Sequence, residues 1–312
     1  MRKLIRLLFL FATLAALAVP AAAHEEGPHN VSELLRAWEF DPLVIAGLAL
    51  LAILYILGLY RLWRRTEVGS AVSVWHAAAF AGSWLSLFLA LVSPLHPWGA
   101  VLFSAHMTQH EILMLISAPL LVLSRPMVAS VWAVPASWRQ PINSFFRSGP
   151  VYTGWRFLTF PLAAWIVHFI ALWLWHLPYL FQATLRSDLV HTLQHFSFFG
   201  SALLFWWSII AGRRGAQSLG AGVLFLFTTS MHSGILGAFL TFSTRDLYPA
   251  YAATSGFWGL SPLEDQQLGG LIMWIPAGLV YIVAALIMFA EWLAESEKSV
   301  RRRESSYSGG IV

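Results

Sequence analysis

The stretch His106–Leu123, HMTQHEILMLISAPLLVL, begins with two histidines and a glutamate and continues as an almost uninterrupted apolar run. A run of this length is typical of a helix that crosses a membrane, because the hydrocarbon core of a bilayer requires about 20 mostly apolar residues. Ionisable side chains rarely face lipid, so we expect the polar start of the run to point into the protein. The stretch therefore predicts a membrane-spanning helix with a polar inward face near one end.

The whole chain has the composition of a polytopic membrane protein. Of its 312 residues, 58% are hydrophobic and only 11% are charged, which argues against a soluble fold. Seven stretches are long and apolar enough to span a bilayer, and they cover residues 43–61, 71–93, 101–123, 157–176, 189–211, 221–242 and 268–292. We therefore expect an all-α bundle of seven transmembrane helices over residues 43–292.

The two ends of the chain differ from this apolar centre. Residues 1–23 combine a basic start, an apolar middle and three final alanines, which is the pattern of a cleaved signal peptide. An uncleaved first helix is the alternative, and both interpretations leave residues 24–42 outside the cytoplasm. Residues 293–312 are polar and basic, so we expect a disordered tail there.

Basic residues indicate the orientation of the bundle. The expected outer segments contain only Arg36, Arg186 and Arg245, and the signal peptide contains three more basic residues, whereas the rest of the 19 lysines and arginines lie in the expected inner segments and the tail. Positive charge accumulates on the cytoplasmic side of membrane proteins. We therefore expect a bacterial inner-membrane protein with a periplasmic N-terminus and a cytoplasmic C-terminus. The same bias explains the net charge of +4 without a nucleic-acid partner.

Two histidine pairs lie near the outer ends of predicted spans. His106 with His110, and His191 with His195, are four residues apart, so each pair projects from one face of its helix. The two pairs have similar predicted depths, and two helices would thus present four imidazoles to one shared space. This arrangement indicates a metal or cofactor site, with a structural hydrogen-bond network as the alternative.

The available ligand types restrict the metals. The chain contains no cysteine, so a metal would be held by imidazole, thioether or carboxylate groups. Imidazole alone suits zinc, iron, nickel and copper, and a thioether shifts the preference toward copper. Met107 and His232 are further candidate ligands. The candidates for orienting the ligands, or for forming a hydrophilic lip above them, are Glu111, His176, Asp265 and Gln266. Capping of the last helix explains Asp265 equally well.

Four separated blocks resemble one known family. These blocks are HMTQHEILMLISAPLLVLSRP, WLWHLPYLFQATLRSDLVHTLQHFSFFGSALLFWW, MHSGILGAFLTFS and SPLEDQQLGGLIMWIPAG. Together they are similar to the CtaG-type cytochrome c oxidase assembly factors, a polytopic family linked to caa-type oxidases, over residues 40–292. The resemblance marks His106, Met107, His110, His176, His191, His195, His232, Asp265 and Gln266. It implies a part in maturing a haem–copper oxidase, most directly by handling copper.

The leading hypothesis is therefore an assembly factor and not an enzyme. It would bind periplasmic copper at the outer cluster of histidines and methionine and pass it to cytochrome c oxidase subunits, with periplasmic copper chaperones as further expected partners. One alternative is a membrane redox protein or enzyme that holds haem b or a di-iron centre through the same histidines. A second alternative is a copper transporter, which would need polar groups along a complete crossing path.

Overall fold

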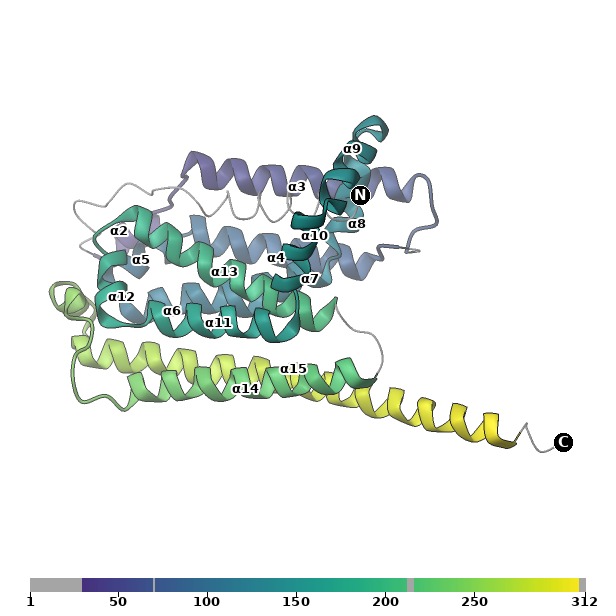
Figure 1. Ribbon diagram of the computed structural model, residues 1–312. Coiled ribbons are helices and arrows are strands. Elements are labelled where there is room, and N and C mark those ends of the chain that lie inside the picture. The colour runs from purple at the N-terminus through teal and green to yellow at the C-terminus, as the bar shows by residue number, and fades with distance from the viewer. Residues whose placement is uncertain (1–29, 70, 212–215, 309–312) are drawn as a thin grey trace.

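The computed structural model describes residues 30–69, 71–211 and 216–308 of the chain. Within these ranges all regular secondary structure is helical (Figure 1). The expected all-α class is therefore confirmed. The predicted signal peptide, residues 1–23, lies outside the described residues.

The first part of the chain runs along the bundle, turns, and returns several times. Its helices are α2 (Val31–Arg36), α3 (Pro42–Trp63), α4 (Val74–Val92), α5 (Leu95–Val101), α6 (Phe103–Glu111), the π-helical η1 (Ile112–Ser117), α7 (Ala118–Leu123), α8 (Pro126–Ala133) and α9 (Ala136–Arg147). The second part contains α10 (Gly149–Leu158), α11 (Pro161–Trp175), α12 (Pro178–Thr184), α13 (Asp188–Ile210), α14 (Ala216–Thr241), the 3-10 helices η2 (Pro249–Ala253) and η3 (Ser255–Trp258), and α15 (Pro262–Ser308).

Five uninterrupted helices are long and apolar enough to cross a membrane. They cover Pro42–Trp63, Val74–Val92, Asp188–Ile210, Ser218–Thr241 and Pro262–Arg301. Two further pairs have the required length and composition together but are bent, by 59° between Phe103–Leu123 and Pro126–Ala133 and by 67° between Gly149–Leu158 and Pro161–Trp175. The described residues thus provide five spans, or up to seven if each bent pair is one span, so the predicted seven is the upper value.

Both bends fall where a proline begins the second helix of the pair. Pro126 opens α8 and Pro161 opens α11, and a proline at the first helical position has no N–H to continue the preceding hydrogen-bond ladder. Before Pro126, the backbone of Arg125 adopts a left-handed conformation with φ 51°, which ends α7. The distribution of apolar residues along the sequence does not predict these bends, because it indicates only the length and composition of each span.

The π-helical η1 directly follows the HMTQHE segment. Its backbone is satisfied from neighbouring helices, since the Trp206 indole donates to the Met114 carbonyl at 3.0 Å and the Ser83 hydroxyl donates to the Ser117 carbonyl at 2.8 Å. Backbone polar groups inside a membrane require such internal partners. π-helical turns within α-helices frequently occur at functional sites, and this one begins directly after the α6 segment that carries the histidine pair.

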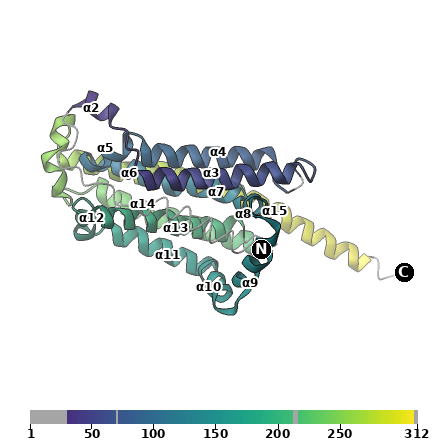
Figure 2. The same cartoon turned by 90° about the horizontal axis from the view of Figure 1, so that it is seen from above.

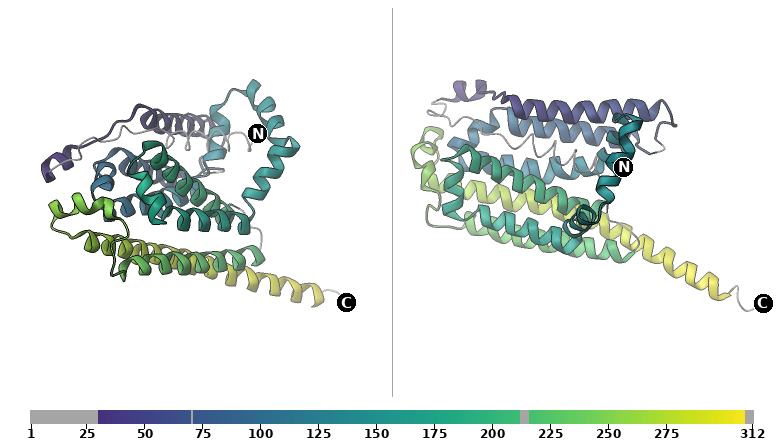
Figure 3. Two further views of the ribbon diagram at one scale, coloured as in Figure 1. Left: turned by 60° about the vertical axis from the view of Figure 1, so that its left-hand side comes forward. Right: turned by 45° about the horizontal axis from the view of Figure 1, so that its top comes forward.

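The last two long helices, α14 and α15, run side by side (Figure 3). Their closest approach is at Gly237 and Gly270, where a Cβ added to either glycine would lie 2.8 Å from the carbonyl oxygen of the other. A Cβ added to the adjacent Gly269 would collide instead with the ring of Phe103 on α6. Gly269 and Gly270 together thus allow α15 to pack closely against two helices, α6 and α14.

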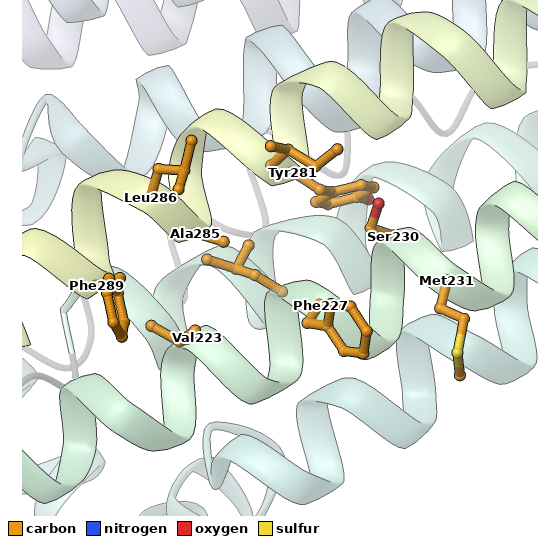
Figure 4. A pocket seen from close by; sticks show the side chains of 10 residues that line it. Val223, Phe227, Ser230, Met231, Tyr281, Ala285, Leu286 and Phe289 are labelled. Carbon is orange, nitrogen blue, oxygen red and sulfur yellow. The ribbon is translucent and has the colours of Figure 1, made fainter.

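A shallow apolar groove lies farther along the α14–α15 interface (Figure 4). Its walls include Phe227, Leu286 and Phe289, and its polar side chains are those of Ser230 and Tyr281. Met231 also lines this groove (Figure 4), and its side chain is exposed. Among the described residues, the groove is lined by no histidine or carboxylate, so its composition suits hydrocarbon.

The segment between α14 and α15 covers one end of the bundle. Figure 2 shows η2 and η3, in light green, at the same end as α2, α5 and α12. Tyr248 and Tyr251 are buried there, and the Tyr248 ring stacks on Phe103 with 4.6 Å between centroids. Leu34 of α2 is also fully buried, against Val101 and its neighbours. The segment between α14 and α15 therefore packs over this end of the bundle.

At the opposite end, α15 continues as a helix to Ser308 and projects beyond the bundle (Figure 1). Over residues 293–308 this differs from the disorder expected for residues 293–312, and residues 309–312 lie outside the described residues. The projecting part is stabilised by helical-spacing ion pairs between Glu297 and Arg301, at 2.6 Å, and between Glu295 and Lys298, at 3.9 Å. Such pairs favour the helix modestly even in water, and the polar composition alone does not reveal them.

Candidate metal centre

The two histidine pairs face each other across α6 and α13. Within the pairs, the ring centroids are 4.4 Å apart for His106 and His110 and 4.3 Å apart for His191 and His195. Between the helices, His106 lies 5.1 Å from His191, and His110 lies 5.2 Å from His195. The structure thus brings together the four imidazoles that the helical spacing and the predicted depths place in one space.

Three of these rings are arranged closely enough to share one ion. His106, His191 and His195 each offer one nitrogen, and these three atoms all lie within 4.8 Å of one another. Metal–nitrogen bonds of about 2 Å place two ligand atoms at most about 4 Å apart, so small side-chain movements would complete coordination. The fourth ring, His110, stands beside this group in edge contact with both His106 and His195.

Several ring nitrogens of the cluster are buried without a hydrogen-bond partner. They are both nitrogens of His110 and the Nε2 atoms of His191 and His195. An unpaired buried polar atom destabilises a fold, and nearly all such atoms in proteins have partners. Unpaired nitrogens within one cluster of imidazole rings therefore favour a site that is completed by a bound ion. An imidazole network without metal would instead pair these atoms with one another.

Hydrogen bonds fix the ring of His106. Its Nδ1 lies 3.2 Å from the carbonyl oxygen of Gly99 and 3.2 Å from the hydroxyl of Tyr251. Because the carbonyl only accepts, Nδ1 is the protonated nitrogen, and Nε2 presents its lone pair to the cluster. The side-chain oxygen Oε1 of Gln194 lies 3.1 Å from this Nε2. The amide nitrogen of Gln194 is buried without a partner, so exchanging the two amide atoms turns Gln194 into a donor to this lone pair. A backbone carbonyl that selects the tautomer is the usual support for a metal-binding histidine.

Tyr251 helps to define this support. Its hydroxyl donates to the Gly99 carbonyl at 2.9 Å, so it lies against both the carbonyl and the His106 ring. Burial, followed by the nearby carboxylate of Asp265, raises the pKa of the Tyr251 hydroxyl well above its ordinary value. The hydroxyl therefore stays protonated and remains a donor.

A fifth imidazole, that of His96, joins the cluster from α5. Its ring stacks on His191 with 5.4 Å between centroids and 6° between planes, and it lies 5.9 Å from His195. The Gln109 amide donates to His96 Nδ1 at 2.8 Å, while His96 Nε2 lies 3.5 Å from a carboxylate oxygen of Glu39. The sequence places His96 in an outer loop but does not join it to the cluster, because loop residues have no periodicity to predict their direction.

The candidate residues around the cluster occupy different positions. The ring of His176 donates from Nδ1 to the Leu172 carbonyl at 2.6 Å, and its buried Nε2 has no partner. Phe198 contacts both His176 and His110, with centroid distances of 5.8 and 4.6 Å. His176 thus lies behind an aromatic ring and not in the converging group. Glu111 follows His110, and its Oε2 is buried without a partner.

Met107 and His232 are directed elsewhere. Met107 is fully buried on the side of α6 that faces α15, where a Cβ added to Gly269 would lie 3.2 Å from its Cγ. The ring of His232 packs against Trp165 and Phe169 of α11, with centroid distances of 5.8 and 4.8 Å. In the described part of the chain, no ring contact joins His232 to the five clustered histidines. Both of its nitrogens are nevertheless buried without partners.

Asp265 and Gln266 hold the surrounding backbone. Asp265 is completely buried and accepts hydrogen bonds from the backbone N–H groups of Phe103 and Ser104, at 2.6 and 3.0 Å. It therefore caps α6. Its neighbour Glu264 accepts a hydrogen bond from the Ser261 N–H at 2.8 Å and caps α15. Gln266 accepts from the Leu247 N–H at 2.7 Å and so fixes the covering loop. These two residues position the site instead of facing its centre.

Comparison with known proteins identifies a related family. Residues 53–295 match the family described as cytochrome c oxidase caa3 assembly factor. This match includes α6, α13 and all five clustered histidines.

The curated relatives are themselves described as uncharacterised. A protein of Mycobacterium bovis is 26% identical over 288 residues, which cover 90% of this chain and 43% of the relative. A protein of Mycobacterium leprae is 24% identical over 283 residues, which cover 89% of this chain and 42% of the relative. The chain thus spans less than half the length of these relatives. No solved structure matches it.

Proposed function

The chain belongs to the cytochrome c oxidase caa3 assembly factor family, and from this premise we propose that it binds copper as cargo at the histidine cluster and delivers it to an oxidase subunit. Membership of this family supports a role in assembly and not in catalysis. The observation that carries the copper proposal is the convergence of the His106, His191 and His195 nitrogens within 4.8 Å. The metal itself is inferred from the donor set and from the needs of a haem–copper oxidase.

The donor set fits Cu(I) because the ion accepts two or three ligands and tolerates imidazole. The absence of cysteine from the sequence leaves imidazole as the main donor available. Met107, although buried on another side of α6, and His232 remain candidate ligands only if their helices rearrange. The five rings of the cluster supply enough donors without them.

Transfer requires that ligands exchange one at a time. Neighbouring rings in the cluster lie between 4.3 and 6.2 Å apart, so one imidazole can form its bond to copper as another releases it. The rings also differ in exposure, since His110 is 1% exposed, whereas the His96 side chain is 12% exposed and next to His191. Copper would therefore move from the deeply buried His110 ring toward the more accessible His96 and His191 rings, which gives its release a direction.

The location we propose is the periplasmic side of a bacterial inner membrane. The bias of basic residues toward the end of the bundle opposite the cluster supports this orientation. The receiving partner would be a copper-binding subunit of the oxidase, and a periplasmic copper chaperone would supply the ion. A signal peptide at residues 1–23 would be consistent with this location.

Copper measurement on the purified full chain tests the proposal. The protein is loaded with Cu(I) under reducing conditions, excess metal is removed, and bound copper is measured by mass spectrometry. We expect His106→Ala with His195→Ala to abolish the bound copper. The matched control is His76→Ala, at the opposite end of the bundle, which should retain it. Unchanged copper in the double variant would refute the site.

Two further measurements separate the alternatives. A strong Soret absorption band in the purified protein would show that the histidines hold haem b and not copper. In cells, deletion should leave the oxidase with haem but depleted of copper, and added copper should restore activity. An oxidase with normal copper content after deletion would refute delivery even if the chain binds the metal.

A further inference from the structure

A second polar site lies at the end of the bundle opposite the histidine cluster. It is a cavity of about 540 Å³ between the end of α3 and the α8–α9 connection. The two helices lie close together near this cavity (Figure 1), because Gly58 has no Cβ to collide with the backbone of α8 at Ala129. The side chains that define the cavity are Tyr60, Arg61, Arg64, Arg65, Trp132 and Arg139.

The cavity concentrates positive charge. Four of its lining residues are arginines, and among the described residues its lining contains no carboxylate. Arginine keeps its charge under all physiological conditions. Four like charges around one cavity repel one another unless an anion lies between them. The composition therefore points to a negatively charged ligand.

Two of the arginines are held rigidly. Arg61 donates from Nη1 to the carbonyl oxygen of Ala133 at 2.7 Å, and Arg139 donates from Nε to that of Val134 at 3.0 Å. The Arg139 guanidinium also lies 5.1 Å from the centroid of the Trp132 ring. A guanidinium has five N–H donors in a fixed plane, so these contacts orient both groups and leave further donors for a ligand.

The other two arginines are exposed at the mouth of the cavity. Arg64 donates to the Tyr60 hydroxyl at 3.2 Å, and Arg65 is exposed. The outward face of α3 continues from this mouth through the exposed side chains of Tyr60, Ile56 and Ile53. These residues follow one helical stripe, which leads from the charged cavity along an apolar track in the spanning part of α3. A ligand with a charged head and a hydrocarbon tail matches both parts.

We propose that this cavity binds the phosphate of an anionic phospholipid headgroup, with the acyl chain along the Ile53–Tyr60 stripe. Arginine forms paired hydrogen bonds with phosphate oxygens, and basic cavities between membrane helices bind anionic headgroups. Tyr60 and Trp132 are the residue types that occupy the headgroup level of a membrane. The lipid would anchor the α3–α8 end of the bundle while the opposite end handles its ligand.

Native mass spectrometry of the purified full chain tests this site. Phosphatidylglycerol, phosphatidylcholine and inorganic phosphate serve as separate probes in one detergent. We expect phosphatidylglycerol to bind several-fold more tightly than phosphatidylcholine, and to bind less tightly as salt is raised. Equal binding of the two lipids would overturn the proposal. Displacement of phosphatidylglycerol by millimolar inorganic phosphate would assign the cavity to free phosphate and would also overturn it.

Variants localise the binding. Arg64→Gln with Arg65→Gln removes two exposed charges and spares the helix-end contacts of Arg61 and Arg139, so the fold should be retained. Each arginine near a membrane surface changes anionic-lipid binding by roughly fivefold, so the pair should weaken it roughly 25-fold. The matched control is Arg156→Gln on α10, whose exposed guanidinium lies over the Tyr152 ring. Equal lipid affinity in the double variant and the wild type, with unchanged melting temperatures, would refute the site.

Discussion

The carboxylate of Asp265 at the start of α15 accepts a 2.6 Å hydrogen bond from the backbone N–H of Phe103 at the start of α6. This bond joins positions 162 residues apart and supplies the cap that α6 lacks from its own sequence, since Leu102 has no polar side chain. Because α6 carries His106 and His110, the carboxylate of one helix sets the position of two candidate ligands on another.

Asp265→Ala should therefore destabilise the protein and weaken metal binding together. It leaves two buried N–H groups and the Ser104 hydroxyl without their acceptor, and we expect the free energy of unfolding to fall by about 2 to 4 kcal/mol. Chemical denaturation in detergent and Cu(I) competition measure the two effects. The control is Glu264→Ala, which removes only an exposed cap of α15 and should lower the free energy of unfolding much less. Equal effects of both substitutions would show that capping of α6 is unimportant.

His96→Ala should lower copper affinity without abolishing binding. The ring stacks on His191 but lies outside the three nitrogens that converge most closely, so its loss removes support and one exchange partner. Losing such support typically weakens metal binding about 10- to 100-fold. Titration against a Cu(I) chelator measures the change. Glu39→Gln retains the imidazole and should have a smaller effect; an unchanged affinity in His96→Ala would exclude this ring from the site.

Gly270→Ala should separate α14 from α15. A Cβ at this position would lie 2.6 Å from the Thr241 nitrogen and 2.8 Å from the Gly237 oxygen, and backbone atoms cannot move aside individually. We expect a loss of about 1 to 3 kcal/mol in unfolding free energy, measured by thermal or chemical unfolding. Gly278→Ala on the same helix is the control, because its nearest neighbour is the Ser230 hydroxyl at 4.0 Å. Alanine there should be neutral or stabilise the helix by up to about 1 kcal/mol. A tolerated Gly270→Ala would contradict the close approach.

Tyr248 makes stability depend on alkaline pH. Burial raises the pKa of its hydroxyl above the ordinary value, and the hydroxyl donates to the His176 carbonyl at 2.8 Å. Below about pH 10 both the folded and unfolded forms keep the proton, so this contribution is complete. As the pH rises further, only the unfolded form ionises, and stability falls by about 1.4 kcal/mol for each unit.

Unfolding measured between pH 8 and about pH 11.5 tests this dependence. Tyr248→Phe should be about 1 kcal/mol less stable at pH 8, because it loses one hydrogen bond, but its stability should decline less steeply above pH 10. The exposed Tyr179 provides the control, since Tyr179→Phe should leave the slope unchanged. Parallel pH profiles for Tyr248→Phe and the wild type would refute the assignment.

The sequence predicts those parts of the site that follow from helical periodicity. The four-residue spacing within HMTQH and within HTLQH places each pair on one face, and the span lengths place both pairs at similar depth. The all-helical class is equally a local property. Each depends on residues that are near one another in the chain.

Other features depend on contacts between distant segments and could not be read from spacing. His96 reaches His191 from a short helix in a loop, and Asp265 caps α6 instead of α15. The bends at Pro126 and Pro161 change the direction of two predicted spans. Proline marks these positions as candidates for a bend, but the direction of the chain after each bend depends on packing.

The π-helical Ile112–Ser117 segment changes which face of the helix each residue of the third predicted span occupies. A π-helical turn contains about one residue more than an α-helical turn. In an α-helix each residue corresponds to about 100° of rotation. A helical wheel drawn through residues 103–123 with a single period therefore assigns wrong faces to one side of Ile112. Deleting one residue from the segment would restore a regular α-helix. His106 and His110 would then turn away from α13, while Leu121 and Val122 kept their packing.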